Sequence, residues 1–507
     1  MMKQIPLCSM LSSLPDPLPD QDTLISGLSC NSNRIKKGDL FVAFPGTISD
    51  GREYISQAIQ NGAQAVVAEK KDSEHFSYPK DILITFVEDL QHKMGFLASY
   101  FYGDPSKGME VIGITGTNGK TTSGLLLYRA LKHLNVPCGL IGTLGVAFNE
   151  EWLPGELTTP DAISIQKNLA YFKSKGAKVV AMEVSSHGLM QHRLNGVNFS
   201  SAIFTNLTRD HLDYHGTMED YGKAKQKLFT WTTLKRAIIN YNSEFSHTLL
   251  DIISQDLPIG LYGQGALSDK LLSRPNVTLV QGDPPVLKGR KMQSQLKTTW
   301  GEGVLSTELI GQFNLHNLMA VLSELSLQGF SLEELLPILA KLKAAPGRMQ
   351  RLGGGRLPLV LIDYAHTPDA LHQALTAARQ YCRRTLWCVF GCGGGRDEGK
   401  RSLMGEIASN LADKVILTND NPRNEAPKKI IEDIMEGIPL EHAQKIIIQK
   451  DRESAIQLAL TRALALDVIL IAGKGHENYQ LEGTESIAFS DSACVNKIFS
   501  EGQHEAV

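Results

Sequence analysis

The stretch Val111-Ile-Gly-Ile-Thr-Gly-Thr-Asn-Gly-Lys-Thr-Thr122 decides how the middle of this chain folds. Its apolar start predicts a buried strand, two glycines end that strand, and a helical pattern then continues to Leu134. A strand, a glycine loop and a helix in this order direct backbone N–H groups and a helix N-terminus toward bound phosphate. The stretch therefore predicts a binding site for ATP or GTP.

Four residues of this loop have separate expected roles. Gly116 and Gly119 let the backbone approach a phosphate chain, Lys120 would reach the β- and γ-phosphates, and the Thr121 hydroxyl would bind Mg²⁺. Ile114 stands where the full Walker pattern has glycine, so the match is the shorter Gly-x-x-Gly-Lys-Thr. The alternative is an ordinary left-handed turn that carries a lysine.

Length, charge and cysteine content narrow the class of protein. A chain of 507 residues is too long for a single core, and about three domains are expected. A formal net charge of −3 gives no reason to expect a nucleic-acid or membrane partner, and no apolar run is long enough to span a bilayer. Seven scattered cysteines without a Cys-x-x-Cys pair, and an N-terminus without a signal-peptide core, favour a cytoplasmic protein without zinc.

Composition and breaks divide the chain into three expected domains. Residues 1–106 contain short strands and one clear helix, and 107–346 contain the phosphate loop and a mostly parallel sheet. Residues 347–507, after the Pro346-Gly347 break, alternate strands with helices and predict a doubly wound α/β domain. The expected fold class is α/β, with a central ATPase-like domain and a Rossmann-like C-terminal domain.

Four short strands of the third region each run directly into polar residues. The expected strands are Leu359–Ile362, Leu386–Phe390, Val415–Leu417 and Val468–Ile471. The polar residues that follow them are Asp363 and His366, Arg396 and Asp397, Asn419 to Arg423, and Lys474, His476 and Glu477. Because ligands bind outside the carboxyl ends of such strands, we expect one composite site there. The glycine-rich stretch before Arg396 does not match a dinucleotide fingerprint, so a nicotinamide cofactor is not expected.

Two arginines at these strand ends, Arg396 and Arg423, favour a ligand with a carboxylate. The planar guanidinium fork matches a carboxylate in two hydrogen bonds, and Pro422 fixes the turn that carries Arg423. An amino acid is therefore the expected ligand. Structural salt bridges are the alternative explanation for both arginines.

Two residues of the second region are candidate metal ligands. Glu183 ends a buried strand in the domain of the phosphate loop, a natural position for a Mg²⁺ ligand. His211 lies in a polar loop just after another strand. A solvent-facing acid and a structural histidine are the respective alternatives. Ser185 and its neighbours lack a Gly-x-Ser-x-Gly elbow, so we expect substrate contacts rather than a nucleophile.

Lys225 lies on the apolar face of a predicted helix that begins near Met218. Thr217 and Asp220 resemble a capping box, and Lys225 falls among the apolar positions of the helix that follows. The apolar positions are Tyr221, Ala224, Leu228 and Phe229. Burial favours the neutral amine, which reacts with CO₂ to give a carbamate able to bind Mg²⁺. The alternative is a lysine that extends to water.

Six motifs in order along the chain resemble those of the Mur ligases of peptidoglycan synthesis. They are Gly113–Thr122, Glu183–Gly188, Thr205–His211, Phe313–Asn317, Gly347-Arg348 and Asp363–His366. Within that family the chain is most similar to the MurE type, which adds the third residue of the stem peptide. The Asp420-Asn-Pro-Arg423 turn is similar to that of members that use meso-diaminopimelate rather than L-lysine.

This resemblance implies three domains and one reaction. ATP phosphorylates the D-glutamate carboxylate of UDP-N-acetylmuramoyl-L-alanyl-D-glutamate, and the amine of meso-diaminopimelate attacks the acyl phosphate to form an amide, with ADP and phosphate as the other products. The implied cofactors are ATP and Mg²⁺. The implied protein is a cytoplasmic monomer that serves cell-wall biogenesis, and so cell shape and division.

The resemblance also implies roles for individual residues. Lys120, Lys225, His211 and Glu183 would be catalytic, and Thr121, Glu183, His211 and a carboxylated Lys225 would hold Mg²⁺. The ATP-binding residues would be Gly116, Thr117, Asn118, Gly119, Lys120, Thr121, Thr122, Asn314, Arg348 and Asp363. The muramoyl-dipeptide nucleotide would contact Ser32, Thr158, Thr159, Ser185, Gln191 and Arg193. Diaminopimelate would contact Arg396, Asp420, Asn421, Pro422, Arg423, Gly473 and Glu477.

Three other functions remain open at this point. An L-lysine-adding ligase shares the motifs, and folylpolyglutamate synthetase has a similar phosphate loop and carboxylated lysine. The N-terminal region of roughly 100 residues and the Asp-Asn-Pro-Arg turn argue against the folate enzyme. A non-catalytic nucleotide-binding regulator is the third, and the joint presence of Lys120, Glu183, His211 and Lys225 argues against it.

Overall fold

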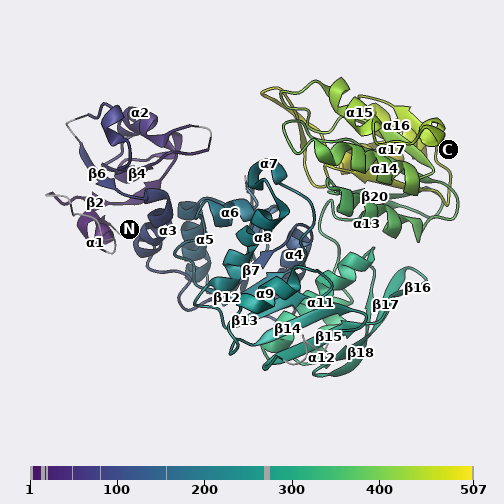
Figure 1. The fold of residues 1–507 in the computed structure, drawn as a ribbon, viewed down its shortest axis with the longest axis horizontal. Coiled ribbons are helices and arrows are strands. Elements are labelled where there is room, and N and C mark those ends of the chain that lie inside the picture. Colours follow the sequence, from purple (N-terminus) through teal and green to yellow (C-terminus); the bar gives the residue numbers. More distant parts are fainter. Residues whose placement is uncertain are drawn as a thin grey trace. The chain divides into compact units, whose positions relative to one another are not determined.

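The computed structural model describes residues 4–12, 18, 21–47, 49–79, 82–155, 157–267 and 274–504 (Figure 1). It divides into two compact units. The first unit comprises Met1–Thr115, Leu131–Ala202 and Ala224–Lys235, and the second comprises Gly116–Ala130, Ile203–Lys223 and Arg236–Val507. Both units combine helices with largely parallel sheets, which confirms the predicted α/β class.

The N-terminal part of the first unit is built on a small parallel sheet of order β3-β4-β5-β6. Its strands are β3 (Gly27–Ser29), β4 (Asp39–Ala43), β5 (Ala65–Glu69) and β6 (Leu83–Val87), accompanied by η1 (Ser32–Arg34), η2 (Gly51–Tyr54), α2 (Ile55–Gln60), η3 (Ser73–His75) and α3 (Leu90–Phe101). A hairpin-like pair, β1 (Ile5–Pro6) and β2 (Leu24–Ile25), lies with α1 (Leu7–Leu11). Successive residues of β4 enter different apolar clusters, Leu40 one and Phe41 the other, so both faces of the sheet are covered.

The rest of the first unit contains the strand order β10-β9-β8-β11-β7. The strands are β7 (Glu110–Thr115), β8 (Cys138–Gly142), β9 (Gly145–Phe148), β10 (Glu151–Leu153) and β11 (Val179–Glu183), with helices α5 (Ala162–Ser174) and α6 (Ser186–Met190). β7, β11 and β8 are parallel, and β9 and β10 continue as an antiparallel hairpin. The chain passes from one unit to the other within α4 (Lys120–His133), β12 (Phe199–Phe204) and α8 (Met218–Gln226).

The second unit contains the strand order β13-β14-β15-β17-β16, with β18 paired to β17. Its elements are α7 (Leu212–His215), β13 (Arg236–Asn240), α9 (Ser246–Ile252), β14 (Ile259–Gln264), β15 (Val277–Gly282), β16 (Val286–Lys288), β17 (Lys291–Thr298), β18 (Gly301–Thr307), α11 (Gln312–Leu327) and α12 (Leu332–Leu339). β13, β14 and β15 are parallel, whereas β16, β17 and β18 are antiparallel. The sequence analysis did not identify this antiparallel group, since its strands alternate polar and apolar residues without a long apolar run.

The C-terminal part of the second unit is a separate six-stranded sheet of order β19-β20-β24-β21-β22-β23. Its strands are β19 (Gln350–Gly353), β20 (Leu359–Asp363), β21 (Leu386–Phe390), β22 (Lys414–Leu417), β23 (Ile446–Ile448) and β24 (Val468–Ala472). Only β19 is antiparallel to its neighbour among these described strands. The helices are α13 (Pro368–Arg379), α14 (Gly399–Leu411), α15 (Pro427–Met435), α16 (Arg452–Arg462) and α17 (Asp491–His504), with η5 (Leu440–Lys445) and the hairpin β25 (Tyr479–Glu482) and β26 (Glu485–Ala488).

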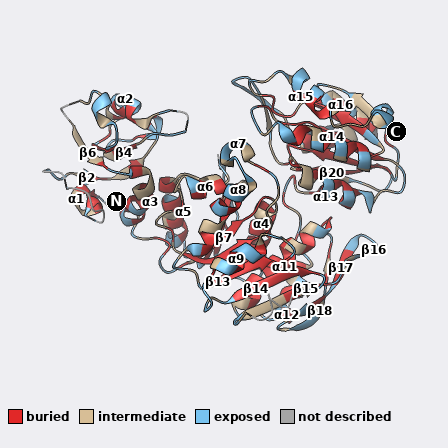
Figure 2. Ribbon diagram, viewed as in Figure 1, coloured by how far each residue is buried: buried red, intermediate tan, exposed pale blue. Residues whose placement is uncertain are grey.

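This C-terminal sheet is doubly wound, as predicted. Along β21, Cys388 packs in one apolar cluster and Trp387 and Val389 in another, so helices cover both faces and every residue of the strand is buried (Figure 2). Residues buried on both sides produce the continuous apolar runs seen in the sequence. The carboxyl ends of β20, β24, β21 and β22 therefore share one edge.

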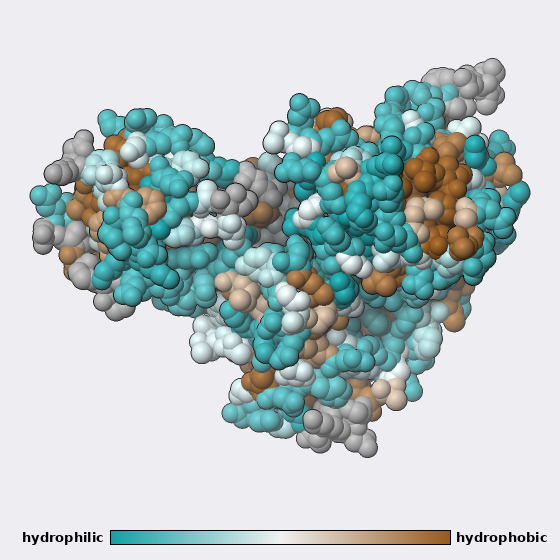
Figure 3. Space-filling model, turned by 45° about the horizontal axis from the view of Figure 1, so that its top comes forward, coloured by the Kyte–Doolittle hydropathy of each residue, from teal (hydrophilic) through white to brown (hydrophobic). Residues whose placement is uncertain are grey.

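None of the helices formed by the described residues is long and apolar enough to cross a membrane. Hydrophilic residues cover most of the face shown in Figure 3, with apolar residues gathered in a few patches.

The helix predicted to carry Lys225 ends earlier than expected. α8 stops at Gln226, and the chain continues as the 3₁₀ helix η4 (Lys227–Thr230). The predicted apolar face nevertheless forms, because Tyr221, Leu228 and Lys225 are all buried. Lys223 points away and pairs with Glu219 on the surface, as expected for a solvated lysine.

Candidate active site

The phosphate loop follows β7 and leads into α4, as the sequence predicts. The loop is tied to the segment after β12: the Asn118 backbone N–H donates to Asn206 Oδ1 at 2.8 Å, and Thr205 Oγ1 donates to the Asn118 carbonyl at 2.6 Å. Gly119 has a φ of +88°, and a Cβ there would lie 2.7 Å from Asn317 Oδ1. Glycine is therefore required at this position both by backbone conformation and by space.

Lys120 begins α4 and folds back over the loop. Its ammonium donates to the carbonyls of Gly116, at 2.7 Å, and Thr117, at 2.9 Å. The Thr121 hydroxyl accepts a hydrogen bond from Arg348 at 3.3 Å. A lysine and a hydroxyl thus stand at the start of a long helix, where the helix dipole also favours an anion.

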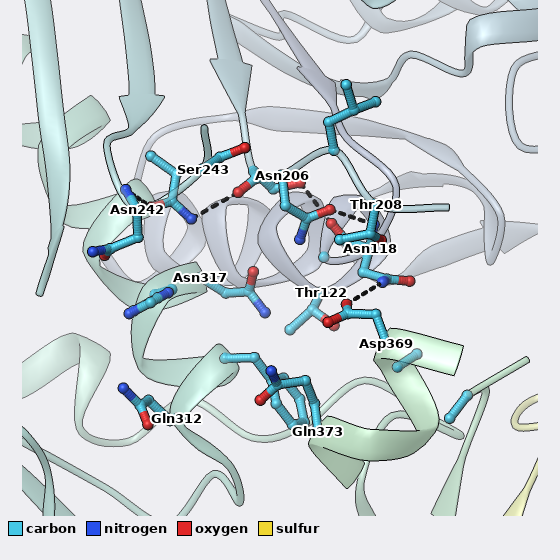
Figure 4. Close-up of a pocket in the computed structure, with 18 of the residues that line it drawn as sticks. Asn118, Thr122, Asn206, Thr208, Asn242, Ser243, Gln312, Asn317, Asp369 and Gln373 are labelled. Atoms are coloured by element: carbon cyan, nitrogen blue, oxygen red, sulfur yellow. Dashed lines mark hydrogen bonds between the residues drawn. The ribbon is translucent and has the colours of Figure 1, made fainter. Parts of the chain in front are cut away.

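A cavity of about 470 Å³ opens beside this loop (Figure 4). It is lined by Asn118, Gly119, Thr122, Thr205, Asn206, Leu207, Thr208, Asn240, Asn242, Ser243, Glu244, Tyr262, Gln312, Phe313, His316, Asn317, Arg348, Asp363, Tyr364, Ala365, Asp369, Ala370 and Gln373. We call this cavity the nucleotide pocket. Asn118 Nδ2 donates across it to Asp369 Oδ2 at 3.2 Å, so the loop and α13 meet there.

Several predicted nucleotide residues lie at this pocket and others support it. Asn118, Gly119, Thr122, Arg348 and Asp363 belong to the lining. Asn314 does not appear among the described lining residues. It is buried, donates to the Ile310 carbonyl at 2.8 Å and accepts from Asn317, which is itself in the lining. Asn314 thus holds the first turn of α11 and orients Asn317.

Burial shifts the pKa values of two groups in the nucleotide pocket toward their neutral forms. Burial lowers the pKa of His316 to about 4, and its Nε2 lies 3.1 Å from Gln264 Oε1. Burial also raises the pKa of Asp363 to about 6, although Arg348 and the Met349 N–H, 2.7 Å away, favour the charged form. Arg348 stacks over the Tyr364 ring, with 4.4 Å between its guanidinium carbon and the ring centre.

A second cavity, of about 130 Å³, lies at the carboxyl ends of the C-terminal strands. It is lined by Asp210, His211, Asp213, Tyr364, His366, Gly391, Cys392, Gly393, Arg396, Asp397, Lys400, Asp420, Asn421, Arg423, Gly473 and Glu477. We call it the charged pocket. The loops after β20, β21, β22 and β24 all contribute to it, so the predicted composite site is present. Pro422 is buried within the turn that carries Asn421 and Arg423.

A buried lysine, which the sequence analysis placed among the strand-end residues without a role, organises one side of the charged pocket. Lys474 is fully buried and donates to Asn421 Oδ1 at 3.0 Å and to Glu477 Oε2 at 3.2 Å. Asn421 Nδ2 also donates to Glu477 Oε2, at 2.8 Å, and the Tyr364 hydroxyl donates to Glu477 Oε1 at 3.3 Å. Its signal was available, because Lys474 follows β24 among the polar residues of the strand ends.

The two arginines of the charged pocket differ in how firmly they are held. Arg423 Nη1 donates to the Gly394 carbonyl at 2.8 Å, and its backbone has a φ of +53°. Its N–H bonds to the Leu481 carbonyl and its carbonyl accepts from Gly483. Arg396 is half exposed, and its Nη1 lies 3.9 Å from Asp213 Oδ2.

Asp210, which the sequence analysis named only as part of a motif, is a buried acid of this pocket with a lowered pKa. Burial opposes its charged form, but a hydrogen bond from His366 and the charges of His366, His211 and Lys400 outweigh burial and hold the Asp210 pKa well below its usual value. Its Oδ2 lies 3.3 Å from His211 Nε2 and 3.6 Å from His366 Nε2. The sequence could have pointed to Asp210, because a histidine follows it directly within Thr208–Asp213.

Five of the six residues predicted to hold the muramoyl nucleotide form one linked cluster in the first unit. Thr159 Oγ1 donates to the Glu183 carbonyl and accepts from the Ser185 N–H, and the Thr159 carbonyl accepts from Arg193 at 2.7 Å. Arg193 also donates to Gln191 Oε1. Thr158 is linked to this cluster because its Oγ1 accepts a hydrogen bond from the Thr143 hydroxyl at 3.0 Å. The sixth residue, Ser32, lies on η1 and donates to Gln57 Oε1 at 2.8 Å.

The predicted metal ligands are distributed over both units. Glu183 and Lys225 are buried in the first unit, and Thr121 and His211 belong to the second. The Glu183 carboxylate is oriented by Thr143, which donates its N–H at 2.8 Å and its hydroxyl at 3.0 Å. A carboxylate, a hydroxyl and the carbamate that a buried lysine can form are hard oxygen donors, which suits Mg²⁺.

Comparison with known proteins assigns these features to one family. Three family models match: the Mur ligase family catalytic domain over residues 24–102, the Mur ligase middle domain over 114–324, and the glutamate ligase domain of Mur ligases over 347–475. The UDP-N-acetylmuramoyl-L-alanyl-D-glutamate–2,6-diaminopimelate ligase of Coxiella burnetii is 44% identical over 470 residues, covering 93% of this chain and 94% of that protein.

Two solved structures extend the comparison. One, described as a UDP-N-acetylmuramoyl-L-alanyl-D-glutamate–2,6-diaminopimelate ligase, is 33% identical with a TM-score of 0.68 and covers 99% of this chain and all of that one. The MurF ligase of Thermotoga maritima in complex with ADP shares the fold at 19% identity, with a TM-score of 0.65 over 95% of this chain and 98% of its own. The chain belongs to the Mur ligase family.

Proposed function

We propose that this protein joins meso-diaminopimelate to UDP-N-acetylmuramoyl-L-alanyl-D-glutamate with ATP, in the synthesis of peptidoglycan precursors. The observation that carries the proposal is the charged pocket, where cations and carboxylates from four strand ends surround a space suited to a small zwitterion. The relatives at 44% identity bear the name of this ligase, which supports it over the L-lysine and folate alternatives.

The first step takes place at the nucleotide pocket. The γ-phosphoryl group of ATP passes to the D-glutamate carboxylate, giving ADP and an acyl phosphate. Two anions approach each other in this step, so catalysis consists mainly of neutralising and positioning charge. Lys120 and the N-terminus of α4 supply positive charge, and Arg348, Asp363 and the rest of the loop position the nucleotide.

We assign Mg²⁺ to Thr121, Glu183, His211 and a carboxylated Lys225. When bound, the ion supplies a Lewis acid that neutralises charge on the transferring phosphoryl group. Burial of Lys225 supports the carboxylation, because a buried amine favours its neutral, reactive form. The carbamate turns a buried cation into an oxygen ligand.

The second step takes place at the charged pocket. The free amine of diaminopimelate attacks the acyl carbon, phosphate leaves, and the amine loses a proton as the amide forms. We assign Arg423 to the distal carboxylate of diaminopimelate, Glu477 to the distal ammonium, and Asp420, Asn421, Arg396 and Gly473 to the remaining contacts. Asp210 and His366 line the same pocket, where His366 Nε2 lies 3.6 Å from Asp210 Oδ2.

The first unit would hold the nucleotide-linked substrate. We assign the uridine end to Ser32 and the muramoyl dipeptide to the cluster of Thr158, Thr159, Ser185, Gln191 and Arg193. We also place the domain boundaries near residues 106 and 346, which the spans of the three family models support. All seven cysteines lie in described residues and are free thiols, in keeping with a monomer in the reducing cytoplasm.

Phosphate release from ATP tests the function directly. The assay is run with UDP-N-acetylmuramoyl-L-alanyl-D-glutamate or a folate as acceptor, and with diaminopimelate, lysine or glutamate as the amine. We expect release only with the muramoyl nucleotide and diaminopimelate together. Equal release with lysine, or release with the folate, would replace the proposed substrate pair.

Carboxylation of Lys225 has a separate test. Lys225→Ala should lose ligation, and formate or acetate should partly restore it by occupying the vacated anion position. Lys223→Ala, an exposed lysine on the same helix, is the matched control and should retain activity. An unmodified Lys225 amine in active, CO₂-equilibrated enzyme, measured by carbon-13 NMR with labelled bicarbonate, would refute the carbamate.

A further inference from the structure

We propose that Arg401, Glu425 and Asp433 form an ion-pair network that positions the glycine loop of the charged pocket and thereby sets its affinity for the amino-acid substrate. The inference rests on the proposed function of that pocket. None of the three residues appears among the described lining residues. They are positioning residues, which act through the backbone that they hold.

Arg401 is the centre of the network. It lies near the start of α14 and its side chain is 1% exposed. Its Nη1 donates to Glu425 Oε1 at 2.6 Å and to Asp433 Oδ2 at 2.7 Å, and its Nη2 donates to Glu425 Oε2 at 2.7 Å. The contact with Glu425 is therefore a two-bond fork between an arginine and a carboxylate, a geometry that lysine cannot reproduce.

The same groups bind the backbone of the glycine loop. Glu425 Oε2 accepts the Gly395 N–H at 3.0 Å, and Arg401 Nη2 lies 3.4 Å from the Gly393 carbonyl. The loop is held from the other side as well, because the Gly394 N–H donates to the Asn421 carbonyl at 3.0 Å. Both sides of the loop thus have fixed partners.

Close packing explains why the loop consists of glycines, and why it needs such support. A Cβ on Gly394 would lie 2.0 Å from the Pro422 carbonyl oxygen, and Gly395 has a φ of +60°. Successive glycines fit this space but lose more conformational entropy on ordering than any other residue. An external anchor is therefore needed to keep a single loop conformation.

The loop position reaches the substrate through Arg423. One N–H of the Arg423 guanidinium is committed to the Gly394 carbonyl. Movement of the loop would release that bond and let the fork rotate away from the pocket. Because Arg396 follows the same glycines, both arginines of the pocket depend on the network.

The network is charged at neutral pH, and a second buried arginine–glutamate pair elsewhere in the protein allows a comparison. The hydrogen bond from Arg401 lowers the pKa of Glu425 in spite of partial burial. Arg236, on β13, also makes a buried contact with a glutamate: its Nε and Nη2 both donate to Glu324 Oε1, at 2.9 and 2.6 Å. Neither residue lines the nucleotide pocket or the charged pocket. That second pair provides a matched control for the cost of disturbing a buried arginine–glutamate contact.

The test compares Arg401→Lys and Glu425→Gln with Arg236→Lys in steady-state kinetics of the full-length enzyme. We expect the two network variants to raise the KM for diaminopimelate about 10-fold or more while the KM for ATP stays unchanged, since small displacements of binding groups have large effects. Arg236→Lys should lower the thermal midpoint without changing the KM for diaminopimelate. Circular dichroism confirms that each variant is folded.

Arg423→Ala separates failure of the network from failure of the pocket. If Arg423→Ala raises the KM for diaminopimelate but folded Arg401→Lys and Glu425→Gln do not, the positioning role is refuted and the pocket stands. If Arg423→Ala has no effect either, the proposed pocket itself is wrong. If Arg236→Lys raises the KM for diaminopimelate as much as the network variants do, the effect is one of general stability, and the proposal is refuted.

Discussion

The two pockets of the second unit differ in how they present charge. Half of the described residues that line the charged pocket are ionisable acids or bases of fixed sign, whereas amides, hydroxyls and backbone groups dominate the much larger nucleotide pocket. Buried acids shift differently even within the charged pocket, where burial raises the pKa of Asp420 but the hydrogen bond from His366 and neighbouring charges lower that of Asp210. Asp363 in the nucleotide pocket has a raised pKa as well.

This difference reflects what each ligand brings with it. A nucleotide with Mg²⁺ carries its own counter-charge, so the protein needs one lysine, helix-end dipoles and a flexible set of hydrogen bonds. A zwitterionic amino acid brings two kinds of charge, and each must meet a fixed opposite partner once water is excluded. Pre-positioned ion pairs suit the second task.

The largest effect should come from Lys120, the lysine of the phosphate loop beside the nucleotide pocket. Lys120→Ala should reduce ligation by about 10²-fold or more, because it removes charge stabilisation that strengthens in the transition state. Phosphate release measures the rate, and an unchanged thermal midpoint shows that the fold is intact. Near-normal turnover in the folded variant would show that the dipoles and amides of this pocket suffice by themselves.

A somewhat smaller and more selective effect is expected in the charged pocket. Arg423→Ala should raise the KM for diaminopimelate by about 10- to 100-fold, since the substrate's distal carboxylate loses its partner. The KM values for ATP and the muramoyl nucleotide should not change. With the unmutated enzyme, lysine should be rejected because it leaves the arginine fork unpaired. An enzyme that prefers lysine would contradict this assignment.

The smallest effect concerns stability rather than rate. It distinguishes Asp363 from Asp210 by how their contributions to stability change with pH. The raised pKa of Asp363 means that its favourable contribution is complete below about pH 4 and is lost as pH rises through about 6, a change of about 3 kcal/mol at most. Asp363→Asn should therefore gain stability relative to the unmutated protein as pH rises from 4 to 7.

Asp210→Asn should behave in the opposite way. Its lowered pKa gives a contribution that is fully present above the unfolded-state value of about 4 and is lost only as pH falls further. The destabilisation of this variant should therefore grow as pH rises from about 2 to 5. Thermal midpoints of both variants between pH 2 and 7 provide the measurement, and parallel curves for the two would refute the contrast.

The pattern of apolar strands followed by polar loops made the C-terminal sheet and its composite site predictable. The runs at β20, β21, β22 and β24 are buried on both faces, so their apolar sequences are unbroken and their polar ends fall on one edge. Lys225 was predictable for the same reason, because helical periodicity placed it among apolar neighbours. The family motifs supplied roles that periodicity alone does not give.

Residues that act through tertiary contacts were not predictable. Arg401 reads as an ordinary helix cation, and only folding brings it against Glu425, 24 positions away. Lys474 was expected at the strand ends, but its contact with Asn421, more than 50 positions earlier, was not. The β16–β18 group was missed because one face of its strands is exposed and its apolar content is low. Likewise, Asn314 matches a nucleotide motif but bonds to Ile310, just before its own helix, and to Asn317 within it.

The left-handed backbone of Arg423 has a consequence for attempts to change amino-acid choice. Outside glycine, asparagine and aspartate this conformation costs on the order of 1 kcal/mol, and it is worst for β-branched side chains. A mutant library at position 423 would therefore select at the same time for a compatible backbone conformation and for contact with the carboxylate. Valine, isoleucine and threonine would be lost for backbone reasons, while glycine and asparagine would survive with the carboxylate contact gone. Redesign of specificity is better begun at Arg396, whose backbone carries no such restriction.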